Sequence, residues 1–151
     1  MIQVIYVDDE LDNPLTRMIA RLLTTNGMKC ELRLPPPDLA EVANWDLDIF
    51  LIDYDLASAK VDEKLIGYSG NSLATEVRNK KPSCPIILVS RKDVLSARGL
   101  HLTTGRSDLD LILYKNDILN NQEKTLKEIL ALHDGYVQLV EIQDQPWSGV
   151  L

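Results

Sequence analysis

Short runs of apolar residues alternate along the chain with longer segments in which apolar residues recur at helical spacing. The runs are the candidate strands, and they lie at 2–7, 29–34, 48–53, 85–90 and 109–114. Several are apolar on both faces, which is typical of a parallel sheet covered by helices on each side. The candidate helices lie between Asn13 and Gly27, at 38–45, at 71–80, near 93–102 and from about 117 to 133. With right-handed crossovers, these five pairs predict an α/β fold with a doubly wound five-stranded parallel sheet and helices on both faces.

The first helix has the clearest local signals. Asn13 is a candidate N-cap, and Pro14 occupies the first helical position. An apolar stripe follows, formed by Leu15, Met18, Ile19, Leu22 and Leu23. Gly27 is expected to end the helix. We therefore expect this helix to pack one face against the sheet.

Two segments do not fit the alternation. Residues 54–69 form a charged connection that is much longer than the ~2–6 residues usual between a strand and a helix, and such loops are often functional. Gly135 is expected to end the last helix, which divides the chain into a domain at 1–134 and a C-terminal tail at 135–151. The tail would be a linker or a docking segment, in which Trp147 anchors a partner or packs on the domain.

The length of 151 residues fits one domain, and the composition excludes several classes of protein. A net charge of −7 opposes the phosphate neutralisation that nucleic-acid binding needs, so no nucleic-acid contact is expected. No apolar run approaches the ~18 residues of a membrane span, and the N-terminus lacks a secretory signal pattern. We therefore expect no membrane contact and a cytoplasmic location. Cys30 and Cys84 lack metal-ligand spacing and are expected to be reduced, buried thiols.

Polar and charged residues gather where the candidate strands end. They are Asp8, Asp9 and Glu10 after the first strand, Asp53 and Asp55 after the third, Ser90 after the fourth and Lys115 after the fifth. Ligands of open parallel sheets bind at the carboxyl ends of the strands, so these groups are expected to converge on one cleft. Clustered carboxylates repel one another unless a cation neutralises them, and Mg²⁺ prefers oxygen ligands of this kind. A lysine and a serine hydroxyl can contact phosphoryl oxygens, and an aspartate can accept a phosphoryl group.

These residues resemble the motifs of response-regulator receiver domains of two-component signalling. The matching segments are VDDE after the first strand, LIDYD after the third, NSLATEVRNKKPSCPIILVS through the fourth and LYK at the fifth. The likeness covers residues 1 to about 133. The resemblance implies that Asp53 accepts the phosphoryl group, that Ser90 is the switch hydroxyl and that Lys115 contacts the phosphoryl group.

The resemblance also implies a Mg²⁺ site. Asp9 and Asp53 would bind the metal directly, Asp8 would act largely through metal-bound water, and Asp55 would lend its backbone carbonyl. A flavodoxin-like sheet with strand order 2-1-3-4-5 is implied as well.

A protein of this family is a signalling protein rather than an enzyme. The resemblance implies a sensor histidine kinase or a phosphotransfer protein as the phosphoryl donor. The surface of residues 90–112 would switch on phosphorylation and, with the C-terminal tail, control a partner, a homodimer or an attached effector domain.

Four features depart from the usual receiver pattern. They are Arg91 directly after Ser90, Asn116 directly after Lys115, Ile112 in place of a common aromatic residue, and a long interval from Asp53 to Gly70, the apparent loop glycine. Arg91, Asn116 and the long loop favour an alternative, a pseudo-receiver that binds partners without being phosphorylated. A second alternative is a Mg²⁺-dependent phosphohydrolase of the haloacid-dehalogenase type, because D-Y-D after an apolar strand with a later serine and lysine resembles that family too. Chain order argues against it, since VDDE precedes D-Y-D and little chain remains after Lys115 for that family's further acidic pair.

Overall fold

The computed structural model describes residues 1–54, 56, 60–61, 64–65, 68, 70–91 and 109–144. The first half of the chain forms β1 (Ile2–Val7), α1 (Pro14–Thr25), β2 (Met28–Arg33), the 3-10 helix η1 (Leu39–Asn44) and β3 (Ile49–Asp53). Two short strands follow, β4 (Lys60–Val61) and β5 (Lys64–Leu65), which pair with each other in antiparallel fashion. The second half forms α2 (Gly70–Lys80), β6 (Ile86–Ser90), β7 (Leu111–Tyr114), α4 (Lys115–Asn120) and α5 (Gln122–Asp144).

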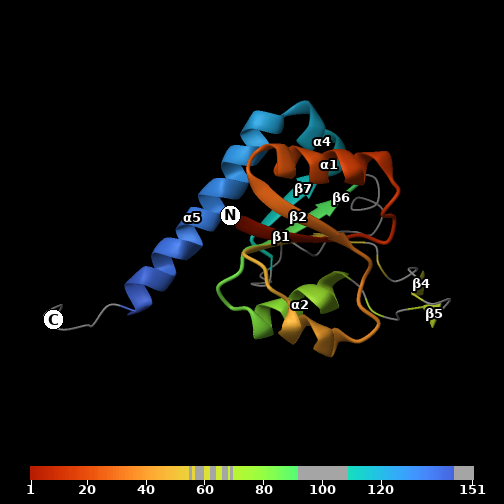
Figure 1. Cartoon of the computed structure of the whole chain (residues 1–151), viewed down its shortest axis with the longest axis horizontal. Coiled ribbons are helices and arrows are strands. Elements are labelled where there is room, and N and C mark those ends of the chain that lie inside the picture. The colour runs from red at the N-terminus through yellow and green to blue at the C-terminus, as the bar shows by residue number, and fades with distance from the viewer. Residues whose placement is uncertain are drawn as a thin grey trace, which may run out of the picture.

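Five strands form one parallel sheet in the order β2-β1-β3-β6-β7 (Figure 1). The predicted fold class and strand order are therefore confirmed. The central strands β3 and β6 are buried at every position, so they need cover on both faces. Their continuous apolar runs are the sequence signal of that burial.

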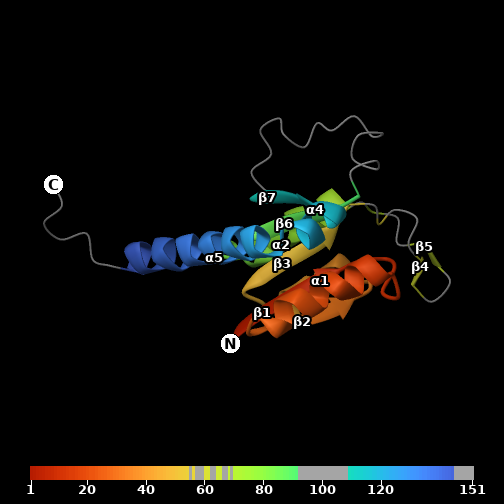
Figure 2. The same cartoon turned by 90° about the horizontal axis from the view of Figure 1, so that it is seen from above.

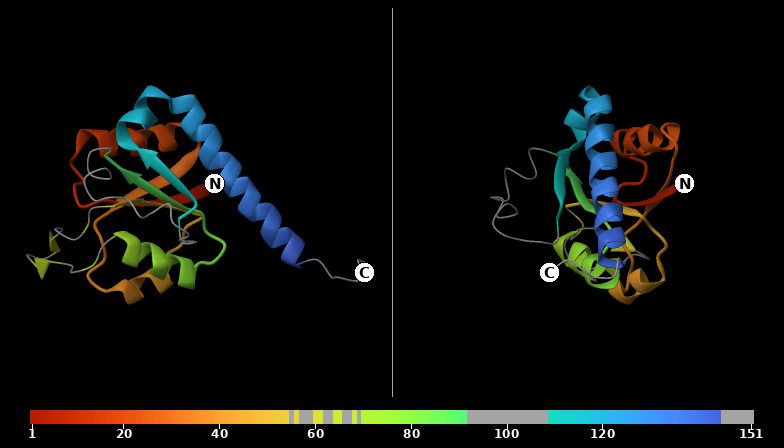
Figure 3. Two further views of the ribbon diagram at one scale, coloured as in Figure 1. Left: turned by 180° about the vertical axis from the view of Figure 1, so that it is seen from behind. Right: turned by 90° about the vertical axis from the view of Figure 1, so that its left-hand side faces the viewer.

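Alternate strand residues face two separate cores, one on each side of the sheet. On one face, Tyr6, Leu51 and Val89 pack with Ile19 and Leu23 of α1, Ile118 of α4 and Ile129 of α5. On the other face, Phe50, Ile52 and Leu88 pack with Val42 of η1 and with Leu73 and Val77 of α2. Figures 1 and 3 show α1 and α4 on one side of the sheet and α2 on the other. This is the predicted arrangement of helices on both faces.

Helix α1 begins as predicted, because Asn13 Oδ1 accepts a hydrogen bond from the Leu15 N–H over 2.9 Å. Its buried face differs from the predicted stripe. The buried residues are Thr16, Ile19, Ala20 and Leu23, whereas Met18 is 50% exposed. Counting apolar residues alone therefore overlooked a polar residue, Thr16, on the buried side of the helix.

Three predicted helices differ in the structure or cannot be compared with it. The segment predicted as a helix at 38–45 is the short 3-10 helix η1. The helix predicted at 117–133 is divided into α4 and α5, because Asn121 ends α4 and its carbonyl accepts the Thr125 N–H as α5 begins. The helix predicted near 93–102 lies outside the described residues.

The prediction that Gly135 ends the last helix is wrong, since α5 continues through it to Asp144. The reason is a contact distant in sequence: Tyr136 Oη donates a hydrogen bond to Asp110 Oδ1 over 2.6 Å and holds the helix past the glycine. The C-terminal half of α5 projects beyond the sheet (Figure 2). Residues 145–151 lie outside the described part of the chain, and the division into a domain and a tail stays a prediction. Among the helices described here, we find none with the length and apolar character needed to span a membrane.

Candidate functional site

The parallel register brings the predicted site residues to one edge of the sheet. Val7 of β1 is paired with Ile52 of β3, so the residues that follow, Asp8 and Asp53, lie side by side. Asp53 is in turn paired with Val89, the residue before Ser90. Ser90 is paired with Tyr114, the residue before Lys115. The predicted convergence of Asp8, Asp53, Ser90 and Lys115 therefore follows directly from the strand pairing.

Three carboxylates form the centre of this edge. Asp8, Asp9 and Asp53 each place one carboxylate oxygen within 4.8 Å of the others. Asp8 is 0% exposed and Asp53 8% exposed, whereas Asp9 is half-buried. Burial and the negative charge of Asp8 raise the pKa of Asp53 to about 8, and the positive charge of Lys115 offsets part of that rise. Burial, followed by a hydrogen bond and the charge of Asp8, raises the pKa of Asp9 to about 6.

These raised pKa values mean that negative charge at Asp9 and Asp53 is costly in the protein alone. A divalent cation removes that cost, and hard oxygen ligands at this spacing suit Mg²⁺. The donor set of Asp8, Asp9 and Asp53 is therefore compatible with the predicted metal. Asp55, the predicted fourth ligand, lies outside the described residues.

Asp8 is held by three donors. Its Oδ1 accepts the Glu10 N–H over 2.9 Å. Its Oδ2 accepts the Thr16 hydroxyl over 2.8 Å and the Lys115 ammonium over 2.8 Å. These bonds satisfy both carboxylate oxygens of Asp8, which is fully buried. This network makes Asp8 the link between β1, α1 and the lysine at the end of β7.

Ser90 and Lys115 share a small polar hollow with Asp53. The hollow has a volume of about 50 Å³ and is lined by Asp9, Glu10, Asn13, Asp53, Ser90, Arg91 and Lys115. The Ser90 hydroxyl is buried and has no hydrogen-bond partner within the described part of the chain. A buried hydroxyl without a partner costs free energy unless a ligand supplies one. The hollow therefore combines an acidic cluster, an available hydroxyl and an ammonium group.

The residues that depart from the receiver pattern have different positions around this hollow. Arg91 is one of the residues that line it. Asn116 is exposed. The peptide bond between Lys115 and Asn116 is trans, as are all the others among the described residues. Ile112 packs with the core that also contains Leu88. Gly70 lies against the backbone of Asp53 and Tyr54, so the glycine that follows the long loop adjoins the site.

Thr16 is a site residue that the sequence analysis missed. A signal was present, because Thr16 lies three and seven positions before Ile19 and Leu23 and is therefore on the same helical face. A polar residue on an otherwise apolar face, close in sequence to Asp8, indicates a buried partner for a polar group.

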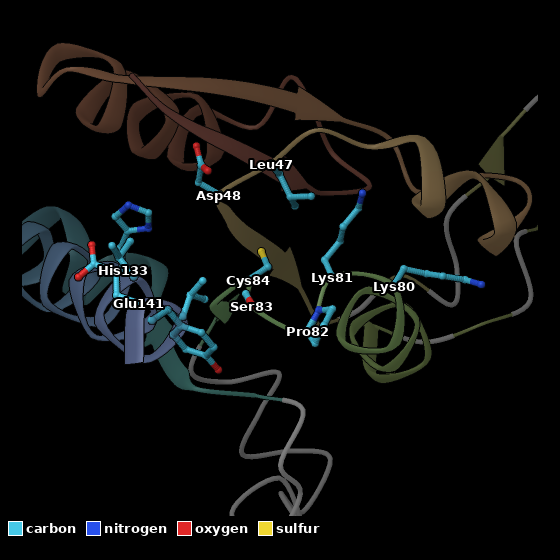
Figure 4. Close-up of a pocket in the computed structure, with 12 residues that line it drawn as sticks. Leu47, Asp48, Lys80, Lys81, Pro82, Ser83, Cys84, His133 and Glu141 are labelled. Atoms are coloured by element: carbon cyan, nitrogen blue, oxygen red, sulfur yellow. The ribbon is translucent and has the colours of Figure 1, made fainter. Parts of the chain in front are cut away.

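A larger hollow lies at the opposite edge of the sheet, where the strands begin (Figure 4). It has a volume of about 430 Å³ and is bounded by the C-terminal half of α5 and the connection from α2 to β6. Leu47, Val137 and Val140 contribute apolar atoms to it, and the thiol of Cys84 faces it as well. Burial raises the pKa of Cys84 to about 12, so the thiol stays protonated near neutral pH and is a poor nucleophile. Cys30 is likewise a free cysteine, but it is half-buried, whereas both cysteines were predicted to be buried.

Comparison with solved structures identifies neighbours with the same fold. The response regulator TrrA from Thermotoga maritima, in complex with Mg²⁺ and BeF, is 18% identical with a TM-score of 0.60; the match covers 85% of this chain and 99% of that chain. A CheY-like receiver domain protein from Methanospirillum hungatei is 18% identical with a TM-score of 0.53, covering 87% of this chain and 98% of that one. A Rhodopirellula baltica structure described as adenylate cyclase is 15% identical with a TM-score of 0.67, covering 95% and 98%.

The sequence itself matches no family model, and no curated protein matches it. The structural neighbours nevertheless include response-regulator receiver domains with the same five-stranded parallel sheet. The resemblance stated from the sequence is thus confirmed at the level of the fold. What the chain does has to be argued from its own site residues.

Proposed function

We propose that this chain is the phosphoacceptor receiver domain of a response regulator, with Asp53 as the residue that is phosphorylated. One observation carries the proposal: Asp53 lies in a single hollow with Asp9, Ser90 and Lys115, and no described residue is a hydrogen-bond partner of the Ser90 hydroxyl. These are the groups that phosphoryl transfer to a carboxylate needs, namely an acceptor oxygen, a metal ligand and donors for the phosphoryl oxygens.

In the proposed reaction, an Asp53 carboxylate oxygen forms a bond to phosphorus while the bond from phosphorus to the donor group breaks. The donor leaves with the electron pair of that bond, as a histidine imidazole from a kinase or as acetate from acetyl phosphate. The Lys115 ammonium and the Ser90 hydroxyl donate hydrogen bonds to the transferred group and stabilise its charge. Asp53 must be ionised to attack, so neutralisation of its acidic neighbours is part of the proposal.

Mg²⁺ is the proposed cofactor. When bound, it supplies charge neutralisation to the acceptor and to the phosphoryl oxygens. Asp9 and Asp53 would hold it, with Asp8 acting largely through metal-bound water and Asp55 contributing its carbonyl. The neighbour from Thermotoga maritima was solved with Mg²⁺ and BeF, which supports this choice of metal.

The proposal extends to partners. The phosphoryl donor would be a sensor histidine kinase or a phosphotransfer protein, and the chain would act as a signalling protein rather than as an enzyme with its own substrate. Ser90 would move toward the phosphoryl group and shift the surface of residues 90–112, which would control a partner, a second copy or an attached effector domain. Of this surface, residues 92–108 lie outside the described part of the chain.

The test is phosphorylation by acetyl phosphate in the presence of Mg²⁺. Intact-mass spectrometry should show one phosphoryl adduct on the wild type and none on Asp53→Asn. Asp48→Asn is the matched control, because Asp48 is an exposed aspartate at the other end of the same strand. No adduct on the wild type, together with no binding of beryllofluoride, would overturn the proposal.

A pseudo-receiver is the second candidate, and one observation favours it. Arg91 lines the hollow beside Ser90, where a small residue would leave more room for a phosphoryl group. Arg91→Ala distinguishes the two functions. If the wild type accepts no phosphoryl group but Arg91→Ala does, Arg91 blocks the site and the wild type is a pseudo-receiver.

Hydrogen exchange tests the proposed output. Beryllofluoride should change protection in residues 90–112 if the site is coupled to that surface. Changes confined to the residues around the metal would refute the coupling between the site and residues 90–112.

A further inference from the structure

Thr16 is a fully buried polar residue in the first turn of α1. Asn13 Oδ1 accepts hydrogen bonds from the Leu15 and Thr16 N–H groups and so fixes this turn. A side chain in the first turn of a helix points back toward the N-terminus, which here directs Thr16 to the end of β1. Burying a hydroxyl costs free energy unless it forms hydrogen bonds, so the hydrogen-bond partners of Thr16 indicate its role.

The Thr16 hydroxyl is bonded on two sides. Its oxygen accepts a hydrogen bond from Lys115 Nζ over 3.2 Å, and its proton is donated to Asp8 Oδ2 over 2.8 Å. Lys115 Nζ also donates directly to the same Asp8 oxygen over 2.8 Å. The three groups therefore form a closed triangle, although they come from the end of β1, from α1 and from the start of α4.

This triangle determines how the ammonium group is turned. A lysine ammonium has three N–H donors and rotates readily about its last bond. A single hydrogen bond to Asp8 would hold the ammonium at only one point. With Thr16 as a second acceptor, the ammonium is held by two oxygens on the buried side, and Lys115 still lines the hollow that contains Asp53 and Ser90.

We propose that Thr16 is a positioning residue that orients the Lys115 ammonium, so that an N–H not bonded to Asp8 or Thr16 is presented to a phosphoryl oxygen on Asp53. The inference rests on the proposed function, and it adds a residue that belongs to none of the motifs of the resemblance. The group that the oriented ammonium would contact is a tetrahedral group on the Asp53 carboxylate, either the phosphoryl group or its beryllofluoride mimic.

Thr16→Val is the test variant, because valine keeps the branched shape and removes the hydroxyl. Beryllofluoride affinity at saturating Mg²⁺ should fall by about tenfold or more, as expected when a hydrogen bond to a charged group is lost. Thr16→Ser restores the hydroxyl and should recover most of the affinity. Binding of Mg²⁺ alone should change by less than about threefold, because Thr16 is not an oxygen ligand of the metal in this proposal.

Thr24→Val is the matched control. Thr24 lies two turns further along α1, and its hydroxyl donates to the Ala20 carbonyl over 2.9 Å, away from the acidic cluster. This variant also loses one threonine hydroxyl from the same helix. It should bind beryllofluoride as the wild type does.

Three results would overturn the proposal. The first is wild-type affinity for beryllofluoride in Thr16→Val, which would show that the hydroxyl does not matter for the anion. The second is an equal loss of affinity for Mg²⁺ alone, which would show that the hydroxyl supports the whole acidic cluster. The third is failure of Thr16→Ser to recover binding, which would show that the threonine acts through packing.

A second readout does not depend on phosphoryl chemistry. The ¹⁵N signal of the Lys115 ammonium should be visible and protected from hydrogen exchange in the wild type and in Thr16→Ser, and lost or broadened in Thr16→Val. A wild type that binds no beryllofluoride would overturn the proposed function. An unchanged ammonium signal in Thr16→Val would instead overturn the role of Thr16, even in a wild type that is phosphorylated.

Discussion

A Cβ atom added to Gly70 would lie 2.8 Å from the backbone oxygen of Asp53. It would also lie 2.9 Å from the backbone oxygen of Tyr54, to which the Gly70 N–H donates a hydrogen bond over 3.3 Å. The first residue of α2 is therefore in direct contact with the end of β3. Glycine is needed at this position because the two backbones approach closely, whatever the length of the loop between them.

We expect Gly70→Ala to separate α2 from the end of β3. The free energy of unfolding should fall by about 1–3 kcal/mol, as is usual when an atom is forced into a packed site. Because Asp53 ends β3, its carboxylate would shift as well, and Mg²⁺ affinity should fall in the same variant. Chemical denaturation and an NMR titration with Mg²⁺ measure the two effects.

Gly135→Ala is the control for this change. A Cβ at Gly135 would meet no atom of the described residues within 4 Å, and the glycine lies inside α5. Alanine should therefore raise the free energy of unfolding by about 0.5–1 kcal/mol, because alanine is more favourable than glycine inside a helix by this amount. If Gly70→Ala keeps the stability and the Mg²⁺ affinity of the wild type, then the close approach of Gly70 to the end of β3 does not determine the position of Asp53.

Asp9→Asn should weaken Mg²⁺ binding by about tenfold or more, because a site with one or two carboxylate ligands depends on each of them. Affinity for the wild type should rise as the pH is raised from about 6 to about 8, since Asp9 and Asp53 have pKa values in that range and must lose their protons to bind. Asp12→Asn is the control, because the Asp12 side chain is 96% exposed. Equal affinities for the wild type and Asp9→Asn would contradict the metal assignment.

Asp53→Asn should stabilise the metal-free protein at and above neutral pH. The pKa of Asp53 is raised to about 8 in the folded state, so the folded state holds a proton that the unfolded chain releases at about pH 4. Stability therefore falls as the pH rises from about 4 to about 8, and the neutral amide removes that loss. Thermal unfolding at a series of pH values measures the difference, which should be largest at about pH 8 and above and vanish near pH 4.

Mg²⁺ provides the complementary measurement. At ten times its dissociation constant the metal should stabilise the wild type by about 1.4 kcal/mol, and it should have little effect on Asp53→Asn. If the free energy of unfolding of the wild type does not fall between pH 4 and pH 8, then ionisation of Asp53 in the folded state does not destabilise the protein.

The strands and the convergence of the site could be predicted from the sequence because both depend on local order. Continuous apolar runs such as 48–53 and 85–90 form buried strands, and parallel pairing then brings Asp53 and Ser90 to one edge. The strand order was not available from the pattern itself. It came from the resemblance, and the structure confirms it.

Two of the errors concern contacts between residues distant in sequence. Gly135 has the local signature of a helix end, but Tyr136 is bonded to Asp110 and the helix continues. Thr16 interrupts an apolar stripe, yet its partner Lys115 lies 99 positions away. Periodicity places Thr16 on the apolar face of its helix, but it does not identify Lys115 as the partner.

The bond between Tyr136 and Asp110 gives the last prediction. Asp110 accepts three hydrogen bonds: Tyr136 Oη at 2.6 Å, Arg78 Nη2 at 2.6 Å and the Ile86 N–H at 2.8 Å. Arg78 also lies over the Tyr136 ring, with 5.6 Å from its guanidinium carbon to the ring centroid. This cluster joins α5 to the ends of α2 and β6 and to the residue before β7.

Tyr136→Phe keeps the ring and removes the hydroxyl that donates to Asp110. We expect the free energy of unfolding to fall by about 1–3 kcal/mol, because the lost bond joins a phenol to a partly buried carboxylate. Hydrogen exchange should become faster in residues 137–144, the part of α5 that extends past the sheet, while α1 keeps its protection. Leu139→Ala is the control, since Leu139 is 56% exposed and its loss should change stability by less than about 0.5 kcal/mol. Unchanged exchange in 137–144 of Tyr136→Phe would mean that the helix continues past Gly135 without help from Asp110.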